Sequence, residues 1–267
     1  MGNMSRIFAI PLSLPEAGEH GPEAPADGED VVEIALHEPA LTADNLGLKT
    51  WASSYLLAKR MLILRSSLPP LPPEVSILEL GAGTGLVGLS TACILQRKVV
   101  LTDLPEIVPN LQRNVDANAA LLSQLNGDAE AAVLDWSQPS AFAPPSAGLD
   151  QKPAEVGQER ACFRLILAAD PIYDASHPAL LVQAIVHHLS QIKDARVVVE
   201  MPIRESYDLE RKDFRDRMMA AGLCIVEEGQ EVGYDDWGSA QAARDRDDEE
   251  NEGLVEVTCW WSVWGWR

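Results

Sequence analysis

The chain has few basic residues, few cysteines and no long apolar run. Lys and Arg together number 21, against 41 Asp and Glu in 267 residues, so the formal net charge is −20 at pH 7. A surface of this charge repels nucleic acid and anionic membranes, and it favours a basic partner. An acidity that only aids solubility explains the same composition equally well. We expect binding to neither nucleic acid nor membrane.

The sequence also lacks the patterns of a membrane span, a secretory signal and a metal site. No apolar run reaches the roughly 18 residues of a membrane span, and no charged segment followed by an apolar one marks a secretory signal. The histidines form no H-x-x-x-H pair, and the cysteines form no C-x-x-C; they are Cys93, Cys162, Cys224 and Cys259. We therefore expect reduced thiols, a cytoplasmic location and no metal site.

Strand-like and helix-like patterns alternate from residue 75 onward. The predicted strands are 75–80, 98–102, 130–134, 163–169 and 195–201, and the predicted helices are 85–96, 105–122, 177–191 and 205–221. The last two strands, 223–228 and 254–261, have no helix between them. This order predicts an α/β fold with a mostly parallel, three-layer sheet and an antiparallel hairpin at one edge.

The remaining segments are less regular. A strand is predicted at 31–36, and a helix begins at about Trp51 and ends before Pro69. The Pro-rich stretch 137–159 and the acidic stretch 230–253 read as loop insertions. The tryptophan-rich run at 260–266 predicts an edge strand that packs on the core.

The segment from Val75 to Asp103 carries the clearest chemical signal. An apolar strand leads into Glu79-Leu80-Gly81-Ala82-Gly83-Thr84-Gly85, and the next strand ends at Asp103. Glycines let a backbone turn sharply and approach a ligand closely. An acid at the end of the second strand accepts hydrogen bonds from ribose hydroxyls. The segment predicts a site for a nucleoside-containing cofactor.

Two cofactors compete for this turn. Residues 83–88 match G-x-G-x-x-G, the dinucleotide fingerprint, but that fingerprint places its first glycine directly after the strand. In that frame Leu86 replaces the third glycine, and the carboxylate of Glu79 repels a pyrophosphate. S-adenosylmethionine carries a sulfonium and an ammonium, which acids attract. The sequence favours S-adenosylmethionine over NAD.

Polar residues follow the later strands as well. Asp135 and Trp136 end the third strand of the alternating series, and Asp170-Pro171-Ile172-Tyr173 ends the fourth. Ligands of such sheets bind beyond the carboxyl ends of the strands. Each residue alone has an ordinary explanation as a turn former. Their recurrence at successive strand ends favours a binding site, with Asp135 and Trp136 near the adenine.

In these motifs the chain resembles the family-16, seven-β-strand protein methyltransferases, and in residues 41–47 its fungal elongation-factor members. The matching segments are 47–51, 79–85, 101–104, 134–136 and 170–173, the last like the family's D-x-x-Y. The resemblance implies a Rossmann-like seven-stranded methyltransferase sheet. We expect one structural unit, made of an N-terminal extension with a capping helix, 1–70, and an S-adenosylmethionine-dependent methyltransferase domain, 71–267.

The resemblance also implies the site. Trp51 packs against the cofactor, and Asp170 and Tyr173 line the channel of the acceptor lysine as catalytic residues. The full set of expected cofactor-binding residues is Trp51, Glu79, Gly81, Gly83, Asp103, Leu104, Asp135, Trp136 and Ala169.

The resulting prediction is a monomeric, S-adenosylmethionine-dependent enzyme that N-methylates a lysine of a protein such as a translation elongation factor. Two alternatives stay open: a small-molecule N- or O-methyltransferase, and a non-catalytic cofactor-binding assembly protein. The acidic stretch 230–253 either steers a basic substrate or is a solvated loop.

Overall fold

A computed structural model describes residues 4–14, 30–40, 46–142, 163–235 and 255–267. Its main sheet has seven strands in the order β5-β4-β3-β6-β7-β9-β8. The strands are β3 (Ile77–Leu80), β4 (Lys98–Asp103), β5 (Asp128–Val133), β6 (Leu165–Ala169), β7 (Arg196–Pro202), β8 (Leu223–Asp235) and β9 (Val255–Trp266). The first five pair in parallel, whereas β9 is antiparallel to both neighbours. The predicted fold class is confirmed.

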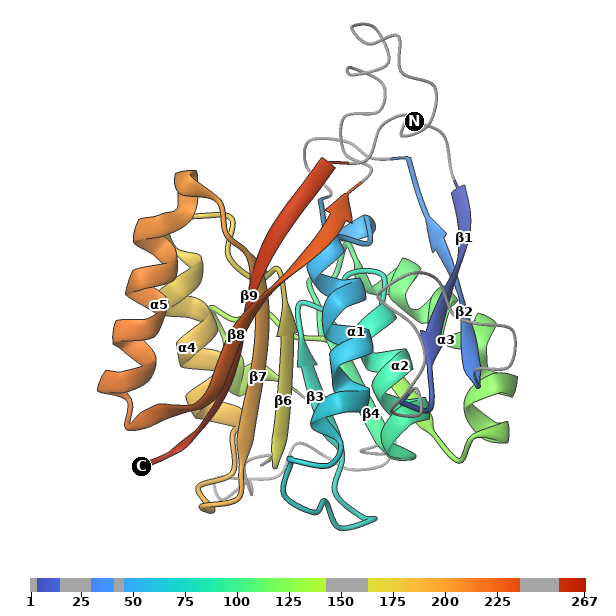
Figure 1. The fold of residues 1–267 in the computed structure, drawn as a ribbon, viewed down its shortest axis with the longest axis horizontal. Helices are drawn as coiled ribbons and strands as arrows, with labels where there is room; N and C mark the ends of the chain where they lie inside the picture. The colour runs from blue at the N-terminus through green and yellow to red at the C-terminus, as the bar shows by residue number, and fades with distance from the viewer. Residues whose placement is uncertain (1–3, 15–29, 41–45, 143–162, 236–254) are drawn as a thin grey trace, which may run out of the picture.

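Helices cover both faces of the sheet (Figure 1). The helices α1 (Ala52–Leu64), α2 (Leu86–Leu95) and α3 (Val108–Gln124) lie on one face, and α4 (His177–His188) and α5 (Asp208–Ala220) lie on the other. Three short 3₁₀ turns complete the elements, at Leu46–Leu48, Pro139–Ala141 and Glu205–Tyr207. Side chains alternate along each strand, so Ile77 faces the first helix layer and Leu78 the second.

A separate hairpin packs outside the first helix layer. Its strands, β1 (Met4–Pro11) and β2 (Val31–Glu38), are antiparallel and form a two-stranded sheet. The alternating residues Val32, Ile34 and Leu36 are buried against α1, α2 and α3, as the period-2 pattern of β2 predicts. The sequence did not reveal that residues 4–11 pair with this strand. The predicted division at residue 70 stays a prediction.

The C-terminal strands differ from the sequence prediction in two ways. First, β8 continues to Asp235, so residues 230–235 are strand rather than insertion. The carboxylate of Asp235 accepts a 2.7 Å hydrogen bond from the N–H of Ala52 and so holds the start of α1. The rest of the acidic stretch, 236–253, and most of the Pro-rich stretch, 143–159, lie outside the described residues.

Second, the sequence predicted an edge strand for the tryptophan-rich run, and this prediction was wrong. The run forms β9, which is an interior strand because β8 lies outside it. Both faces of β9 are buried: Trp261 joins the core on the α1 side, and Trp260 and Trp264 join the core on the α5 side. A strand with apolar side chains on both faces suits an interior position. In the described ranges no helix combines the length and the apolar content that a membrane span requires.

Replacing Trp264 with Ala tests the importance of this strand. Trp264 is fully buried, contacts Phe214 edge-on at 5.8 Å between ring centroids, and donates its indole N–H to Ser262 at 2.9 Å. We expect Trp264→Ala to lower the free energy of unfolding in urea by about 3–5 kcal/mol. Leu209→Ala, at a side chain that is 79% exposed, should change it by less than about 0.5 kcal/mol. Similar losses for both variants would contradict this packing.

Candidate active site

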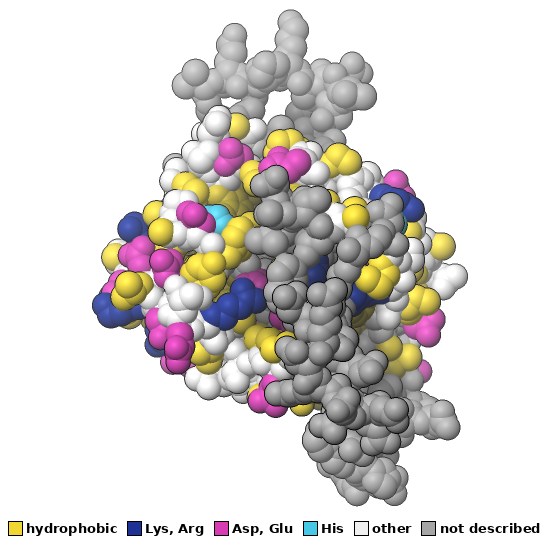
Figure 2. All heavy atoms as spheres, turned by 90° about the horizontal axis from the view of Figure 1, so that it is seen from above, with side chains coloured by type: hydrophobic (Ala, Val, Ile, Leu, Met, Phe, Trp, Pro, Cys, Tyr) yellow, Lys and Arg dark blue, Asp and Glu magenta, His cyan; other side chains and the backbone are white. Residues whose placement is uncertain are grey.

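The carboxyl ends of the parallel strands open onto a cavity of about 360 Å³, a size typical of small-molecule sites. Figure 2 looks onto this end of the molecule and shows hydrophobic, basic and acidic side chains mixed on its visible described surface. Every predicted site residue except Glu79 lines the cavity: Trp51, Gly81, Gly83, Asp103, Leu104, Asp135, Trp136, Ala169, Asp170 and Tyr173.

The glycine turn between β3 and α2 forms one wall. Gly81, Gly83 and Gly85 all have positive φ angles, which a glycine adopts without strain. A Cβ on Gly83 would lie 2.8 Å from the carbonyl oxygen of Gly47, so a side chain there would collide with backbone. The turn is therefore pressed closely against the segment that precedes α1.

Asp103 joins this turn to the end of β4. Its carboxylate accepts hydrogen bonds from the N–H of Gly83 at 2.7 Å and from the N–H of Leu104 at 2.8 Å. Burial raises the pKa of Asp103 to about 6, and the charge of Glu106 adds to the rise, although both hydrogen bonds oppose it. Asp103 is thus an ionised acceptor at neutral pH that needs only a modest acidification to be neutralised.

Glu79 lies behind the turn rather than in the cavity. It shares the face of β3 that Ile77 presents to α2, because side chains alternate along a strand. Its carboxyl group is buried against Gly88 of α2, where a Cβ would collide with it, and accepts a hydrogen bond from the Gly88 N–H. Burial raises the pKa of Glu79 well above its ordinary value. In this structure Glu79 packs between the turn and α2, on the side of the turn that faces away from the cavity.

The end of β5 contributes Asp135 and Trp136. Hydrogen bonds from the hydroxyl and from the N–H of Ser137, the second at 2.8 Å, lower the pKa of Asp135, which also lines the cavity. The ring of Trp136 packs over Gly81, 3.1 Å from the position of a Cβ, and meets His177 edge-on. Asp135 therefore both accepts a hydrogen bond within the turn and lines the cavity, which are the two explanations that the sequence left open.

Asp170 and Tyr173, which follow β6, form a second part of the cavity wall. Asp170 has a positive φ of 47°, and one carboxylate oxygen lies 3.6 Å from the guanidinium of Arg204. Burial raises the pKa of Asp170 to about 6 against the opposing effect of Arg204. Its other oxygen, Oδ1, is buried without a hydrogen-bond partner among the described residues. Tyr173 packs edge-on against His177, at 4.3 Å between ring centroids.

The sequence missed the cationic part of the site. Lys49 Nζ lies 5.0 Å from the centroid of the Trp51 ring, and Arg204 Cζ lies 5.7 Å from it. Both cations line the cavity, together with Tyr207. Arg204 lies two residues beyond the end of β7, so the rule that ligands bind beyond strand ends would have found it.

The chain is similar to known lysine methyltransferases. A family model described as lysine methyltransferase matches residues 30–219. Protein-lysine N-methyltransferase rrg1 of Schizosaccharomyces pombe is 37% identical over 233 residues, which cover 87% of this chain and 67% of that protein. Protein-lysine N-methyltransferase EFM2 of Saccharomyces cerevisiae is 36% identical over 228 residues, which cover 78% of this chain and 49% of that protein.

A shorter similarity extends to EEF1A lysine methyltransferase 3 of Xenopus tropicalis, which is 33% identical over 109 residues, or 41% of this chain and 39% of that protein. The chain thus spans about two thirds of the rrg1 protein and about half of EFM2. The family match covers most of the seven-stranded sheet and the whole cavity wall described above. The resemblance inferred from the sequence motifs is confirmed, and the chain belongs to the lysine methyltransferase family.

Proposed function

We propose that this chain binds S-adenosylmethionine in the cavity and transfers its methyl group to a lysine side chain of a protein substrate. The observation that carries the proposal is the division of one cavity into two walls. The glycine turn and Asp103 form one wall, and Asp170 and Tyr173 form the other. A nucleoside cofactor fits the first wall, and an amine fits the second.

The first wall suits the cofactor's ribose and adenine. Each carboxylate oxygen of Asp103 holds one backbone N–H and keeps a lone pair for a ribose hydroxyl. Asp135 and Trp136 border the space that an adenine would fill, and Leu104 and Ala169 add apolar contact. When bound, S-adenosylmethionine supplies an electrophilic methyl group on a positively charged sulfur. The acids around the cavity favour that cation and disfavour a pyrophosphate.

The second wall suits a lysine amine. The buried Oδ1 of Asp170 is an acceptor that lacks a partner, and an amine N–H satisfies it. A lysine with an ordinary pKa near 10.4 must lose a proton before it can attack. Burial in the cavity and the positive charge of Arg204 both favour the neutral amine. Asp170 can accept that proton and, because its pKa is about 6, release it to water at neutral pH.

Tyr173 completes this wall, and Trp51 serves the cofactor. Burial and the nearby carboxylates raise the pKa of Tyr173, so its phenol stays protonated and its oxygen can still accept a hydrogen bond from the amine. The ring of Trp51 also lines the cavity, and we propose that it packs against the cofactor. These residues position the reactants, which is the main contribution that a protein makes to a direct displacement.

The protein substrate that we propose is a translation elongation factor or a similarly basic protein. The name of the Xenopus relative, EEF1A lysine methyltransferase 3, supports this class, and so does the net charge of −20. We propose that the enzyme acts as a monomer in the cytoplasm.

Labelling with tritiated S-adenosylmethionine in a cell lysate tests the proposal. Label that enters a protein band, and that amino-acid analysis recovers as methyllysine, supports it. Asp103→Ala and Asp170→Ala serve as controls and should abolish the label. Label found only in small molecules would favour a small-molecule methyltransferase, and no label with the wild-type chain would contradict methyl transfer.

The titration of Asp103 gives a pH test of the cofactor site. Ribose hydroxyls donate to its ionised form, so protonation below a pKa of about 6 removes the acceptor. We expect the Kd for S-adenosylmethionine to be constant above about pH 7 and to rise by up to about tenfold per unit below pH 6. Calorimetry measures this. Asp103→Asn should bind weakly at every pH, whereas Asp170→Asn should keep the wild-type pH dependence; the reverse pattern would place the cofactor at the other wall.

The titration of Asp170 gives a separate test of the acceptor site. Arg204 lowers the pKa of Asp170, so Arg204→Met should raise it and move the acid limb of the kcat profile upward by roughly one pH unit. Arg204→Lys keeps a positive charge and should move the limb less. Initial rates from pH 5.5 to 8 at saturating cofactor measure the shift. An acid limb that stays in place in Arg204→Met would exclude Asp170 as the titrating group.

A further inference from the structure

Three asparagines on one face of α3 hold strand β2. Asn110, Asn114 and Asn118 are spaced by four residues and therefore stack along the helix. Asn118 accepts a hydrogen bond from the N–H of Ala35 at 3.0 Å and donates to its carbonyl at 2.8 Å. Asn114 accepts from the N–H of His37 at 2.8 Å and donates to its carbonyl at 3.2 Å, to which Asn110 also donates at 2.9 Å. These amides satisfy the edge of β2 that faces away from β1.

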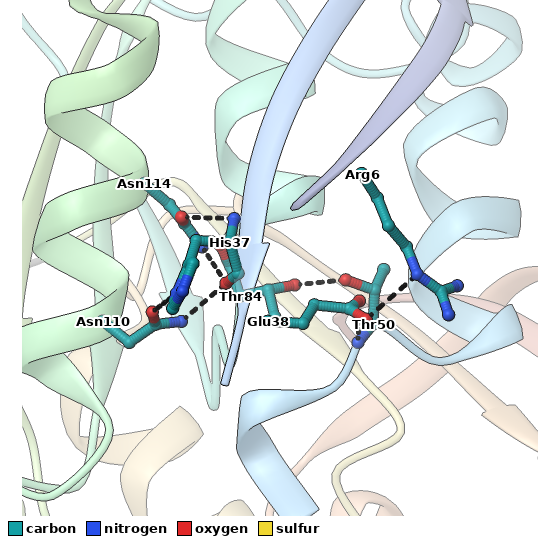
Figure 3. Close-up of polar contacts among 7 residues, drawn as sticks. All are labelled: Arg6, His37, Glu38, Thr50, Thr84, Asn110 and Asn114. Carbon is teal, nitrogen blue, oxygen red and sulfur yellow. Dashed lines mark hydrogen bonds and ion pairs between the residues drawn. The ribbon is translucent and has the colours of Figure 1, made fainter. Parts of the chain in front are cut away.

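Asn114 differs from Asn118 in where its second N–H goes. Asn118 donates to the carbonyl of Asn114 in its own helix at 2.7 Å. Asn114 donates to the carbonyl of Thr84 in the glycine turn at 2.9 Å (Figure 3). Both asparagines are buried, with exposed fractions of 1% and 2%. One amide thus joins β2 to the turn, and its neighbour joins β2 to the helix alone.

A second route leads from β2 to the same threonine. Glu38, the last residue of β2, pairs with Arg6 of β1 at 3.2 Å and accepts a 2.9 Å hydrogen bond from the N–H of Thr50. The hydroxyl of Thr50 lies 2.7 Å from the hydroxyl of Thr84. Figure 3 shows this chain of contacts crossing from the hairpin to the turn. Both the carbonyl and the hydroxyl of Thr84 are therefore held by groups that depend on the end of β2.

We propose that Asn114 and Thr50 are positioning residues for the cofactor: by holding Thr84 they fix the glycine turn, which makes the β1–β2 hairpin part of the cofactor site. The inference rests on the proposed function. Thr84 is bonded to Gly83, whose N–H donates to Asp103 at 2.7 Å. A displaced Thr84 moves Gly83 and breaks that contact with the predicted ribose acceptor.

The same geometry separates cofactor binding from methyl transfer. Neither Asn114 nor Thr50 lines the cavity, whereas Asp170 and Tyr173 do. Loss of either contact should therefore weaken cofactor affinity and leave kcat at saturating cofactor close to the wild-type value.

The paired variants Asn114→Ala and Asn118→Ala test the inference in the full chain. Each removes a buried amide that ties β2 to α3, so both should lower the melting temperature. Calorimetry with S-adenosylmethionine should show a Kd that is about five- to tenfold higher for Asn114→Ala and within about twofold of wild type for Asn118→Ala. Equal effects of the two variants on Kd, whether both large or both absent, would overturn the inference.

Thr50 supplies a test that does not depend on the helix. Thr50→Val keeps the shape of the side chain but removes the hydroxyl, and Thr50→Ser keeps the hydroxyl. We expect a several-fold higher Kd for Thr50→Val, near-wild-type binding for Thr50→Ser, and an unchanged kcat at saturating cofactor for both. Wild-type Kd in Thr50→Val would overturn the role of Thr50. If the wild-type chain itself does not bind S-adenosylmethionine, the proposed function fails, and the inference fails with it.

Discussion

The hydrogen bond from the N–H of Gly83 to the carboxylate of Asp103 joins the two parts of the chain on which the site depends. It links the turn after β3 to the end of β4, at 2.7 Å and in a partly buried position. A buried carboxylate is costly unless it is hydrogen-bonded, and this bond offsets that cost while leaving acceptor capacity free. Because this bond fixes the turn, Gly47 can approach Gly83 closely and Trp136 can pack on Gly81.

The sequence predicted the sheet and many of the cavity-lining residues for a physical reason. Parallel strands deliver their carboxyl ends to one edge, so residues that directly follow strands, such as Asp103, Asp135 and Asp170, meet there whatever the loops do. The sequence also predicted β2, because the alternation of apolar and polar residues along a strand can be seen within that segment alone. What the sequence predicted well is what the regular backbone geometry determines.

Features that depend on distant packing were not predictable in the same way. Glu79 was placed at the loop because it precedes the glycines, but its face of β3 is decided by the alternation that begins at Ile77. The interior position of β9 depends on β8, which pairs with it across the acidic stretch. The role of Asn114 depends on a strand that lies 77 residues away in the sequence. A single amino-acid sequence carries no direct signal of such pairings.

Asp170 shows how the rigid sheet supports an unfavourable residue. Its φ of 47° is rare for a residue with a side chain, and its carboxylate is buried beside the partly exposed guanidinium of Arg204. The N–H of Asp170 donates to the carbonyl of Glu200 at 2.8 Å, which extends the β6–β7 ladder by one residue. Because both strands are buried almost throughout, this contact holds Asp170 in place while Oδ1 stays unpaired. The positive φ and the unpaired oxygen of Asp170 therefore lie in the part of the cavity where we propose that the acceptor amine binds.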